Sequence, residues 1–403
     1  MKTSIVDCQQ TQWHSRPAYV LSNDQVELTH LTGGGQIVDL HFLAGDQVNP
    51  FWIPHWELRD PMEYRDDRDA AKYGPQGTGK LLSAIAGHSL CLEPFGVPSA
   101  EEIRAGATLH GEAGVCHWQA ECAHGPETGE MRFTVPLPGD GLDFARTVSL
   151  RHGESAVRIR ETVHNRRNAD RLIQWQQHVT LAPPFVTRED CRIVLPGAHG
   201  VTFPDGYEGR ELLARDAEFQ WPLAPAANGG SVDLQIPFQK QGKGLIAGVQ
   251  VDPHRDIAFV CAVNRRRNLV FGCVFRRNDF PWITLWEENR ARTGVPWSGV
   301  EQASAIEFGV SPMPIGRAET LRRDEQFGTP VMANLSAESS ISASYLMFLA
   351  HVSGGPQSIA GLACGDNELR LLNDSGGTIS TVSVHGAHEF LTRQDDASSA
   401  SQP

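Results

Sequence analysis

The sequence predicts an all-β protein built as one large antiparallel domain. Between residues 131 and 182, four successive segments alternate or run apolar, and each is bounded by Gly, Asp or Asn. This spacing is typical of a β-sandwich or a larger β-sheet protein. Almost no stretch keeps the 3.6-residue apolar period of an amphipathic helix, so we expect helices to be few and short.

Length and charge narrow the classes of function. With 403 residues the chain exceeds one core of ordinary size, so length alone fits two domains or one large β unit. A net charge of −13 argues against nucleic acid or an anionic membrane as the main partner. No apolar run approaches the ~20 residues of a membrane helix. The N-terminus also lacks the apolar region of a secretory signal.

The eight cysteines predict reduced thiols. None belongs to a C-x-x-C pair, and their scatter is neither that of a zinc knuckle nor that of a disulfide framework. Cys261 and Cys273 sit in the strand-like runs FVCAV and FGCVF, where cysteine acts as a small hydrophobic residue. We therefore expect mostly buried, reduced cysteines in a cytoplasmic protein, and we expect no cofactor.

The N-terminal part of the chain favours hairpins followed by short helices. Residues 1–18 are expected to form an N-terminal arm, and residues 19–43 alternate around an Asn-Asp turn and a triple glycine. The triple glycine is not a phosphate loop, because no Gly-Lys-Ser/Thr follows it. A short helix is expected over residues 66–72, and PSAEE at residues 98–102 is typical of a helix start.

Strands are expected along most of the remaining chain. They cover residues 131–137, 142–151, 156–166, 172–182, 244–251, 257–263, 269–277, 340–350, 357–364, 368–373 and 378–384. Residues 186–233 are rich in turn residues and are expected to form lids over one end of the sheets. We expect a single domain over residues 19–390 and a disordered polar tail over residues 391–403.

The stretch between residues 280 and 312 is the most informative for function. It is expected to form two strands and a turn, and it combines tryptophans with acids and arginines. Aromatic faces stack on the C–H face of a sugar, and charged groups hydrogen-bond its hydroxyls, so this composition favours a sugar site. The alternative is a buried strand with surface ion pairs, because most aromatic residues belong to cores. The candidate substrate-binding residues here are Trp282, Trp286, Trp297, Arg290 and Arg292.

Strand periodicity ranks the acids of this stretch. If the stretch begins with a strand, Glu288 shares one face with Trp282 and Trp286. Glu287 then shares the other face with an isoleucine and a leucine, which looks like core, so Glu288 is expected to point into the groove. A β-bulge would reverse the choice, so Glu287 ranks second. Glu307 ranks a distant third and is expected to pair with an arginine.

The order of these features resembles the aldose 1-epimerase, or galactose mutarotase-like, superfamily over about residues 19–385. GGGQIVDLHF resembles the opening strands of the family, and His110-Gly111 lies where a family histidine is expected. WQQHVTLAPPF, which contains His178, resembles a strand histidine followed by Leu and Phe. WEENR resembles the late strand that carries an acid. The resemblance implies a large antiparallel β-supersandwich with a carbohydrate groove.

Two features depart from the family pattern. Residues 79–88 occupy the region of the family's early Asn-Arg pair, which has no clear counterpart here. The late acid is doubled and follows a tryptophan, unlike the typical sugar epimerases. The resemblance therefore implies sugar binding more directly than it implies one particular reaction.

Mutarotation requires an acid at the ring oxygen and a base at the anomeric hydroxyl. The resemblance implies His178 as the acid and His110 as a second hydrogen-bond donor. Glu288, or else Glu287, takes the part of the base. For each single histidine, the alternative is an ordinary buried or exposed side chain without a catalytic role.

Three further polar residues are candidate substrate contacts: Gln176, Glu112 and His88. Gln176 shares a strand face with His178, a pattern that fits either a solvated face or the floor of a wet groove. A metal site is the alternative interpretation of this region, because an H-x-E spacing places two side chains on one strand face. Its ligands would be His110, Glu112, His117 and His178.

Two classes of function follow from this sequence. The first is an enzyme of the mutarotase type that acts on a free sugar, and the second is a non-catalytic carbohydrate-binding protein on the same fold. A glycoside-processing or lyase enzyme that uses the same groove is a weaker third class. The expected partner is a small-molecule sugar, not a nucleic acid or a membrane, and the chain could form a homodimer.

Overall fold

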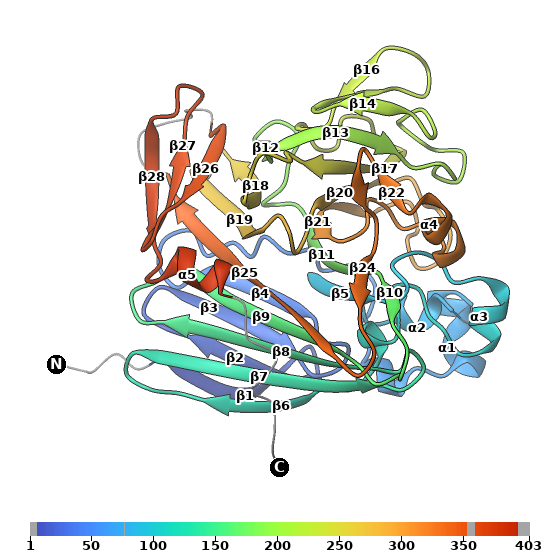
Figure 1. Cartoon of the computed structure of the whole chain (residues 1–403), viewed down its shortest axis with the longest axis horizontal. Helices are drawn as coiled ribbons and strands as arrows, with labels where there is room; N and C mark the ends of the chain where they lie inside the picture. Colours follow the sequence, from blue (N-terminus) through green and yellow to red (C-terminus); the bar gives the residue numbers. More distant parts are fainter. Residues whose placement is uncertain (1–5, 76, 353–358, 394–403) are drawn as a thin grey trace.

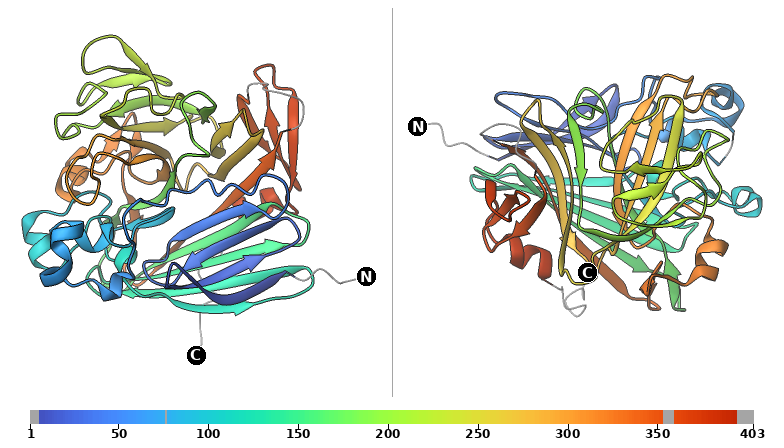
Figure 2. Two further views of the ribbon diagram at one scale, coloured as in Figure 1. Left: turned by 180° about the vertical axis from the view of Figure 1, so that it is seen from behind. Right: turned by 90° about the horizontal axis from the view of Figure 1, so that it is seen from above.

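Two large antiparallel sheets face each other and enclose the main hydrophobic core (Figure 1, Figure 2). The computed structural model describes residues 6–75, 77–352 and 359–393. Within these residues the larger sheet has 13 strands and the smaller sheet has eight. The all-β antiparallel architecture predicted from the sequence is therefore confirmed.

The larger sheet runs from the N-terminal hairpins to strands of the middle of the chain. In order across the sheet, its strands are β1 (Asp7–Trp13), β2 (Arg16–Ser22), β3 (Val26–Leu31), β4 (Ile37–Phe42), β5 (His88–Leu92), β11 (Trp175–Leu181), β21 (Gln302–Gly309), β20 (Trp282–Asn289), β17 (Lys243–Val251), β13 (Gly197–Thr202), β14 (Glu218–Gln220), β15 (Leu223–Pro225) and β16 (Ser231–Asp233).

The smaller sheet is formed mainly by long hairpins. Its strands in order are β12 (Cys191–Val194), β18 (Ile257–Asn264), β19 (Leu269–Arg276), β25 (Ser340–His351), β9 (Ala156–Asn165), β8 (Leu142–Arg151), β7 (Thr128–Leu137) and β6 (Gln119–Ala123). In β8 the residues alternate strictly between buried and half-buried, and Phe144 and Val148 point into the main core. This alternation is what a sheet with one core face requires.

Smaller elements cover the two sheets. A three-stranded sheet of β26 (Gly361–Cys364), β27 (Glu368–Leu372) and β28 (Thr378–Ser383), with α5 (Ala387–Thr392), packs on the smaller sheet through a second apolar cluster. The remaining elements are η1 (Pro61–Glu63), α1 (Asp66–Tyr73), α2 (Gly79–Leu82), α3 (Ala100–Arg104), η2 (Ala113–Val115), α4 (Arg317–Arg323), the pair β10 (Arg171–Ile173) and β24 (Ala333–Leu335), and the pair β22 (Glu325–Gln326) and β23 (Thr329–Pro330). None of the helices in the described ranges is long and apolar enough to cross a membrane.

Most predicted elements are present, and the helix start at Ser99 is confirmed in detail. Ser99 accepts a hydrogen bond from the Glu102 amide while the Glu102 carboxylate accepts one from the Ser99 amide, which is a capping box. The predicted strand over residues 172–182 is divided into β10 and β11 at Gln174. Part of the strand predicted over residues 357–364 lies outside the described residues.

Three expectations need correction. Residues 7–18 do not form a separate arm, because β1 pairs with β2 along its whole length. Residues 186–233 contain five short strands as well as loops, and four of them extend the larger sheet. In the expected tail, Leu391 is buried against the second apolar cluster, while residues 394–403 lie outside the described part.

The cysteines also differ from the expectation. Cys8 on β1 and Cys122 on β6 form a disulfide, whereas the other six are free. Because β1 and β6 are the edge strands of the two large sheets, this bond joins one edge of the larger sheet to one edge of the smaller sheet. The prediction of reduced thiols is therefore wrong for this pair.

Candidate functional site

A cavity of about 430 Å³ lies on the face of the larger sheet that points away from the main core. Four adjacent strands, β11, β21, β20 and β17, contribute His178, Glu307, Trp286 and Ile246 to it. Loops and α2 complete the wall with Trp52, Leu81, Leu82, Ile85, Phe95, Val97, Leu109, His110, Phe203, Asp205, Gly206, Tyr207, Glu208, Arg292, Trp297 and Pro314.

The register of β11 and β21 brings an imidazole and a carboxyl group together. Gln177 pairs with Phe308 and Thr180 pairs with Ala305, so His178 stands opposite Glu307. His178 Nε2 lies 3.5 Å from Glu307 Oε1. Directly opposed residues of an antiparallel pair share a face, so both side chains reach the cavity from its floor.

Burial keeps this pair from carrying charge easily. Desolvation raises the pKa of the Glu307 carboxyl well above its ordinary value and lowers the pKa of His178 well below its ordinary value. Glu307 Oε2 is buried and has no hydrogen-bond partner within the described residues. An unpaired buried carboxyl oxygen that lines a cavity is available to a ligand.

A second imidazole, that of His110, lies beside the pair. Its ring centroid is 5.1 Å from that of His178, and its Nδ1 lies 2.6 Å from the carbonyl oxygen of Phe95. Because a carbonyl only accepts, Nδ1 carries the proton. Burial lowers the pKa of His110 to about 4, so its ring is neutral at pH 7 and Nε2 is a hydrogen-bond acceptor. In this arrangement Nε2 of His110 can accept a hydrogen bond from a ligand, whereas the sequence predicted that His110 would donate one.

Aromatic side chains form one side of the cavity. Trp52 stacks on Trp297 with a centroid distance of 5.9 Å and an interplanar angle of 5°, and Trp286 packs edge-on against both. The Arg292 guanidinium lies 4.5 Å from the centroid of Tyr207 and 4.9 Å from that of Trp297. Such contacts hold a cation over aromatic faces, so Arg292 is fixed at the cavity wall.

Glu288 and Glu287 occupy the two faces predicted for them, but neither lines the cavity. Glu288 is fully buried and accepts hydrogen bonds from the Tyr207 hydroxyl, at 2.8 Å, and from the amides of Ala291 and Arg292. Glu287 points to the opposite face and accepts from the Phe238 amide at 3.1 Å. Glu288 therefore supports the loop that carries Arg292, while the carboxyl group beside His178 belongs to Glu307.

The other sequence candidates divide in the same way. Trp286, Trp297 and Arg292 line the cavity, whereas the other five candidate substrate contacts do not. Trp282 donates to the Pro330 carbonyl, Arg290 to Gln302 and Gln176 to Thr284. His88 is buried near Gln177 and Tyr345, and Glu112 lines a smaller cavity and accepts from the Gly139 amide.

The metal interpretation finds no support in the geometry. Among the described residues, no group of three or more His, Cys, Asp or Glu side chains is arranged to hold a metal ion. His178 uses Nδ1 for the Thr180 hydroxyl at 2.9 Å, and His110 uses Nδ1 for the Phe95 carbonyl.

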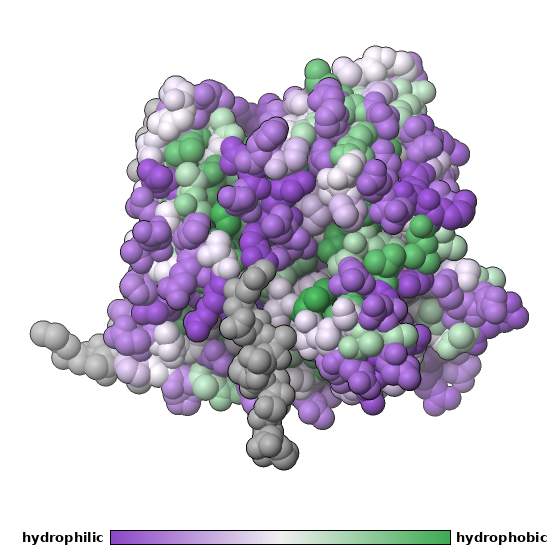
Figure 3. Space-filling model, in the orientation of Figure 1, coloured by the Kyte–Doolittle hydropathy of each residue, from purple (hydrophilic) through white to green (hydrophobic). Residues whose placement is uncertain are grey.

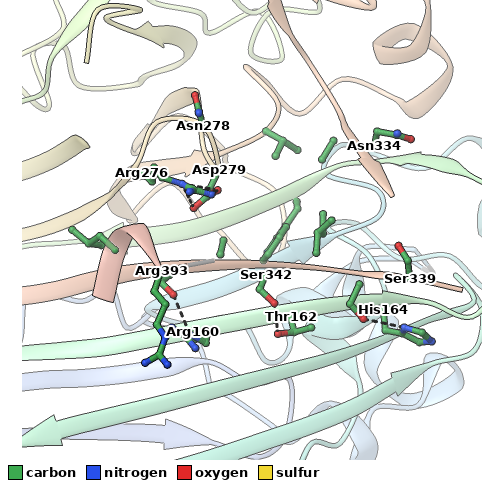
Figure 4. A pocket seen from close by; sticks show the side chains of 18 of the residues that line it. Arg160, Thr162, His164, Arg276, Asn278, Asp279, Asn334, Ser339, Ser342 and Arg393 are labelled. Atoms are coloured by element: carbon green, nitrogen blue, oxygen red, sulfur yellow. Dashed lines mark hydrogen bonds and ion pairs between the residues drawn. The ribbon is translucent and has the colours of Figure 1, made fainter. Parts of the chain in front are cut away.

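A larger groove of about 890 Å³ lies elsewhere, on the outer face of β9 and β25 (Figure 4). Its polar side chains pair mainly across these strands, with Thr162 Oγ1 2.8 Å from Ser342 Oγ and His164 Nδ1 3.0 Å from Ser340 Oγ. Its imidazole thus contacts a hydroxyl, not a carboxyl group. For acid–base chemistry the smaller cavity is the better candidate.

The sequence interpretation missed Trp52, Tyr207 and the importance of Glu307. Trp52 lies in the run NPFWIPHW, whose aromatic density is a visible signal. Glu307 was visible as an acid on a predicted strand, but its proximity to His178 depends on the register of β11 and β21. Tyr207 sits in a turn-rich loop with no local signal.

Comparison with known proteins shows similarity of fold. No protein-family model and no curated protein matches the sequence. A candidate aldose 1-epimerase from Klebsiella pneumoniae has 15% identity and a TM-score of 0.62, covering 85% of this chain and 83% of that chain. A galactose mutarotase-like protein from Clostridium acetobutylicum has 12% identity and a TM-score of 0.57, covering 86% and 99%. One from Lactobacillus casei has 12% identity and a TM-score of 0.51, covering 83% and 100%.

Proposed function

We propose that this chain, which has a galactose mutarotase-like fold, binds a small sugar in the 430 Å³ cavity and interconverts its anomers by acid–base catalysis. The observation that carries the proposal is the buried contact between His178 and Glu307 at the cavity floor. The names of the structural neighbours support the same activity. Because their sequence identity to this chain is low, the structural similarity itself shows only a shared fold.

Ring opening needs two proton transfers, one at each of the two oxygens bonded to the anomeric carbon. The ring oxygen must gain a proton while the anomeric hydroxyl loses one, so that the bond from the anomeric carbon to the ring oxygen breaks and a carbonyl forms. Both oxygens are attached to the same carbon, which suits an acid and a base only 3.5 Å apart. Rotation about the neighbouring bond and the reverse transfers close the ring from the other face.

His178 and Glu307 are the acid and the base, and together they hold one transferable proton. In the neutral form that burial favours, Glu307 is the acid and His178 is the base. In the ion-pair form, His178 is the acid, as the family resemblance implies. During ring opening the acid gives its proton to the ring oxygen while the base takes the proton of the anomeric hydroxyl. Ring closure reverses both transfers and restores the starting form of the pair, so no other acid or base is required.

The neighbouring side chains would hold the sugar in place. His110 Nε2 accepts from a sugar hydroxyl, and Trp286 and Trp297 offer faces for the C–H groups of the ring. Arg292 donates to a further oxygen from the loop that Glu288 supports.

A cytoplasmic location belongs to the same proposal. Six free cysteines, four of them buried, fit a reducing compartment. The Cys8 to Cys122 bond is the observation against it, because disulfides are rare in the cytosol.

The test is anomer exchange of free aldoses followed by NMR or polarimetry. We expect the protein to accelerate exchange and His178→Ala to lose at least about 10²-fold of that acceleration, which is a typical contribution of general acid–base catalysis. Sugar binding without acceleration in the parent protein would instead support the non-catalytic carbohydrate-binding alternative.

A further inference from the structure

We propose that the sugar taken by this cavity is neutral and carries an apolar substituent, such as a deoxy carbon, a methyl ether or an acyl group, on the edge that faces α2. This inference rests on the proposed function, because it concerns the substrate of the same site. It assigns to the cavity a chemical class of sugar that the acid–base pair alone does not specify.

One wall of the cavity is aliphatic. Leu81 and Leu82 belong to α2, Ile85 follows that helix, and Val97 and Leu109 come from the loops before and after α3. These side chains carry no hydrogen-bonding atom. A sugar hydroxyl pressed against them would lose water without gaining a partner, whereas a methyl or acyl group would gain from the same burial.

The aromatic wall also offers few polar atoms. Trp52 Nε1 donates to Glu301 at 2.7 Å, and Trp286 Nε1 donates to the Tyr207 hydroxyl at 2.9 Å. The Tyr207 hydroxyl in turn donates to Glu288. Because these groups are already paired with the protein, they remain turned away from a bound sugar, and the wall contributes flat apolar faces.

The charged groups near the mouth of the cavity favour a neutral sugar. Arg292 is accompanied there by Asp205 and Glu208, and its Nε lies 3.4 Å from Glu208 Oε1. Glu208 is 69% exposed and so marks the side open to solvent. A phosphate or carboxylate on the sugar would approach two acids together with one guanidinium, so an anionic substituent gains little.

The aliphatic wall continues to the surface, so it can follow a substituent longer than a methyl group. Val97 is 56% exposed although it is apolar, and its carbonyl lies beside Gly316, the residue before α4. Figure 3 shows hydrophobic side chains gathered on the surface between α4 and the helices α1 to α3. A contiguous apolar surface rimmed by polar residues is typical of a ligand-binding groove.

The experiment compares sugars that differ by one group, by calorimetric titration of the full chain. The pairs are D-galactose with its 6-deoxy derivative, and D-glucose with its 6-deoxy, 2-deoxy and 3-O-methyl derivatives. We expect at least one derivative to bind more tightly than its parent sugar, and we expect a gain of about fourfold where the wall covers the added methyl group of the 3-O-methyl derivative. Equal or weaker binding of every derivative would overturn the inference.

A matched pair of variants locates the effect. Leu82→Asn should remove the preference for the apolar derivative, while Leu223→Asn, on β15 and 54% exposed, should keep it. Val97→Asn is a second variant whose exposed position leaves the core unchanged, and it should reduce the preference for the largest substituent of the panel, the 3-O-methyl group. A preference that survives both Leu82→Asn and Val97→Asn would refute the role of the wall.

Failure of this inference differs from failure of the proposed function. If the protein binds no member of the panel and accelerates no anomer exchange, both proposals fall. If it binds and converts the fully hydroxylated sugars at least as well as their derivatives, only the inference about the apolar substituent falls.

Discussion

Three buried glutamates on two adjacent strands differ mainly in what their carboxyl groups contact. Glu288 accepts hydrogen bonds from a tyrosine hydroxyl and two backbone amides, and Glu287 accepts from one amide. Glu307 has an imidazole at 3.5 Å and one buried oxygen without a partner among the described residues. A carboxyl group held by several donors supports the structure, whereas Glu307 keeps an oxygen available for chemistry.

Glu287 gives a prediction about stability and pH. Burial raises the pKa of Glu287 from 4.5 to about 8. Between these values the unfolded chain has lost the proton and the folded chain keeps it, so the free energy of unfolding falls as pH rises and levels off above pH 8. The glutamine variant Glu287→Gln should lose this dependence, which amounts to a few kcal/mol at about 1.4 kcal/mol per pKa unit.

Urea unfolding at pH 5 and pH 8 measures this difference for the parent and for Glu287→Gln. The parent should lose more stability than the variant between the two pH values. Equal losses would show that Glu287 titrates normally in the folded protein.

At the scale of elements, the site depends on how β11 and β21 are aligned. Their pairing places His178 opposite Glu307, and Gly309 at the end of β21 allows the two strands to approach. A Cβ atom at Gly309 would overlap the side chain of Gln176 and the carbonyl oxygen of Trp175. The backbone carbonyl cannot move aside without shifting β11 itself.

Gly309→Ala should therefore destabilise the protein by roughly 1–3 kcal/mol, as overpacked cores do, and should slow anomer exchange by displacing His178. Gly361→Ala on β26 is the matched control, because its Cβ would meet no atom of the described residues closer than 3.8 Å. Thermal unfolding and exchange rates of both variants decide the matter. Similar behaviour of the two variants would contradict this account of the strand contact.

Strands were predicted best where apolar and polar residues alternate over a long and regular stretch of the sequence. Residues 142–151 were expected as a strand and form β8 with the same bounds. The short strands β14, β15 and β16 were missed, because three residues are too few to show a period and their turns dominate the composition.

The site was predicted only in part, for a related reason. Strand periodicity correctly separated the faces of Glu287 and Glu288, but it cannot tell which strand will lie next to β11. The choice of Glu307 follows from inter-strand register, which depends on contacts between residues 129 positions apart, as for His178 and Glu307.

At the scale of the whole molecule, the two large sheets are held together by their shared core and by one covalent bond. Cys8 and Cys122 join the edge strands β1 and β6 and are 114 residues apart in the sequence. Closing a loop of about this length restricts the unfolded chain and stabilises the fold by up to ~4–5 kcal/mol in the chain-entropy model.

The free energy of unfolding of the double variant Cys8→Ser, Cys122→Ser should therefore be lower than that of the parent by about 2–4 kcal/mol, which is typical for removal of one disulfide. Cys364→Ser, which changes a free and half-buried thiol, is the control and should change stability little. Chemical unfolding without reductant measures both variants. A double variant as stable as the parent would mean that the shared core alone holds the two sheets together.

We propose above all that the His178–Glu307 pair on the larger sheet catalyses anomer exchange. The most direct measurement is the NMR exchange rate of an aldose that the protein binds, compared among the parent, Glu307→Gln and Glu287→Gln. The two variants make the same change of side chain at buried carboxyl groups on neighbouring strands. We predict a loss of at least about 10²-fold for Glu307→Gln and a change of less than a few-fold for Glu287→Gln. Equal rates for the parent and Glu307→Gln, or a loss confined to Glu287→Gln, would contradict the claim.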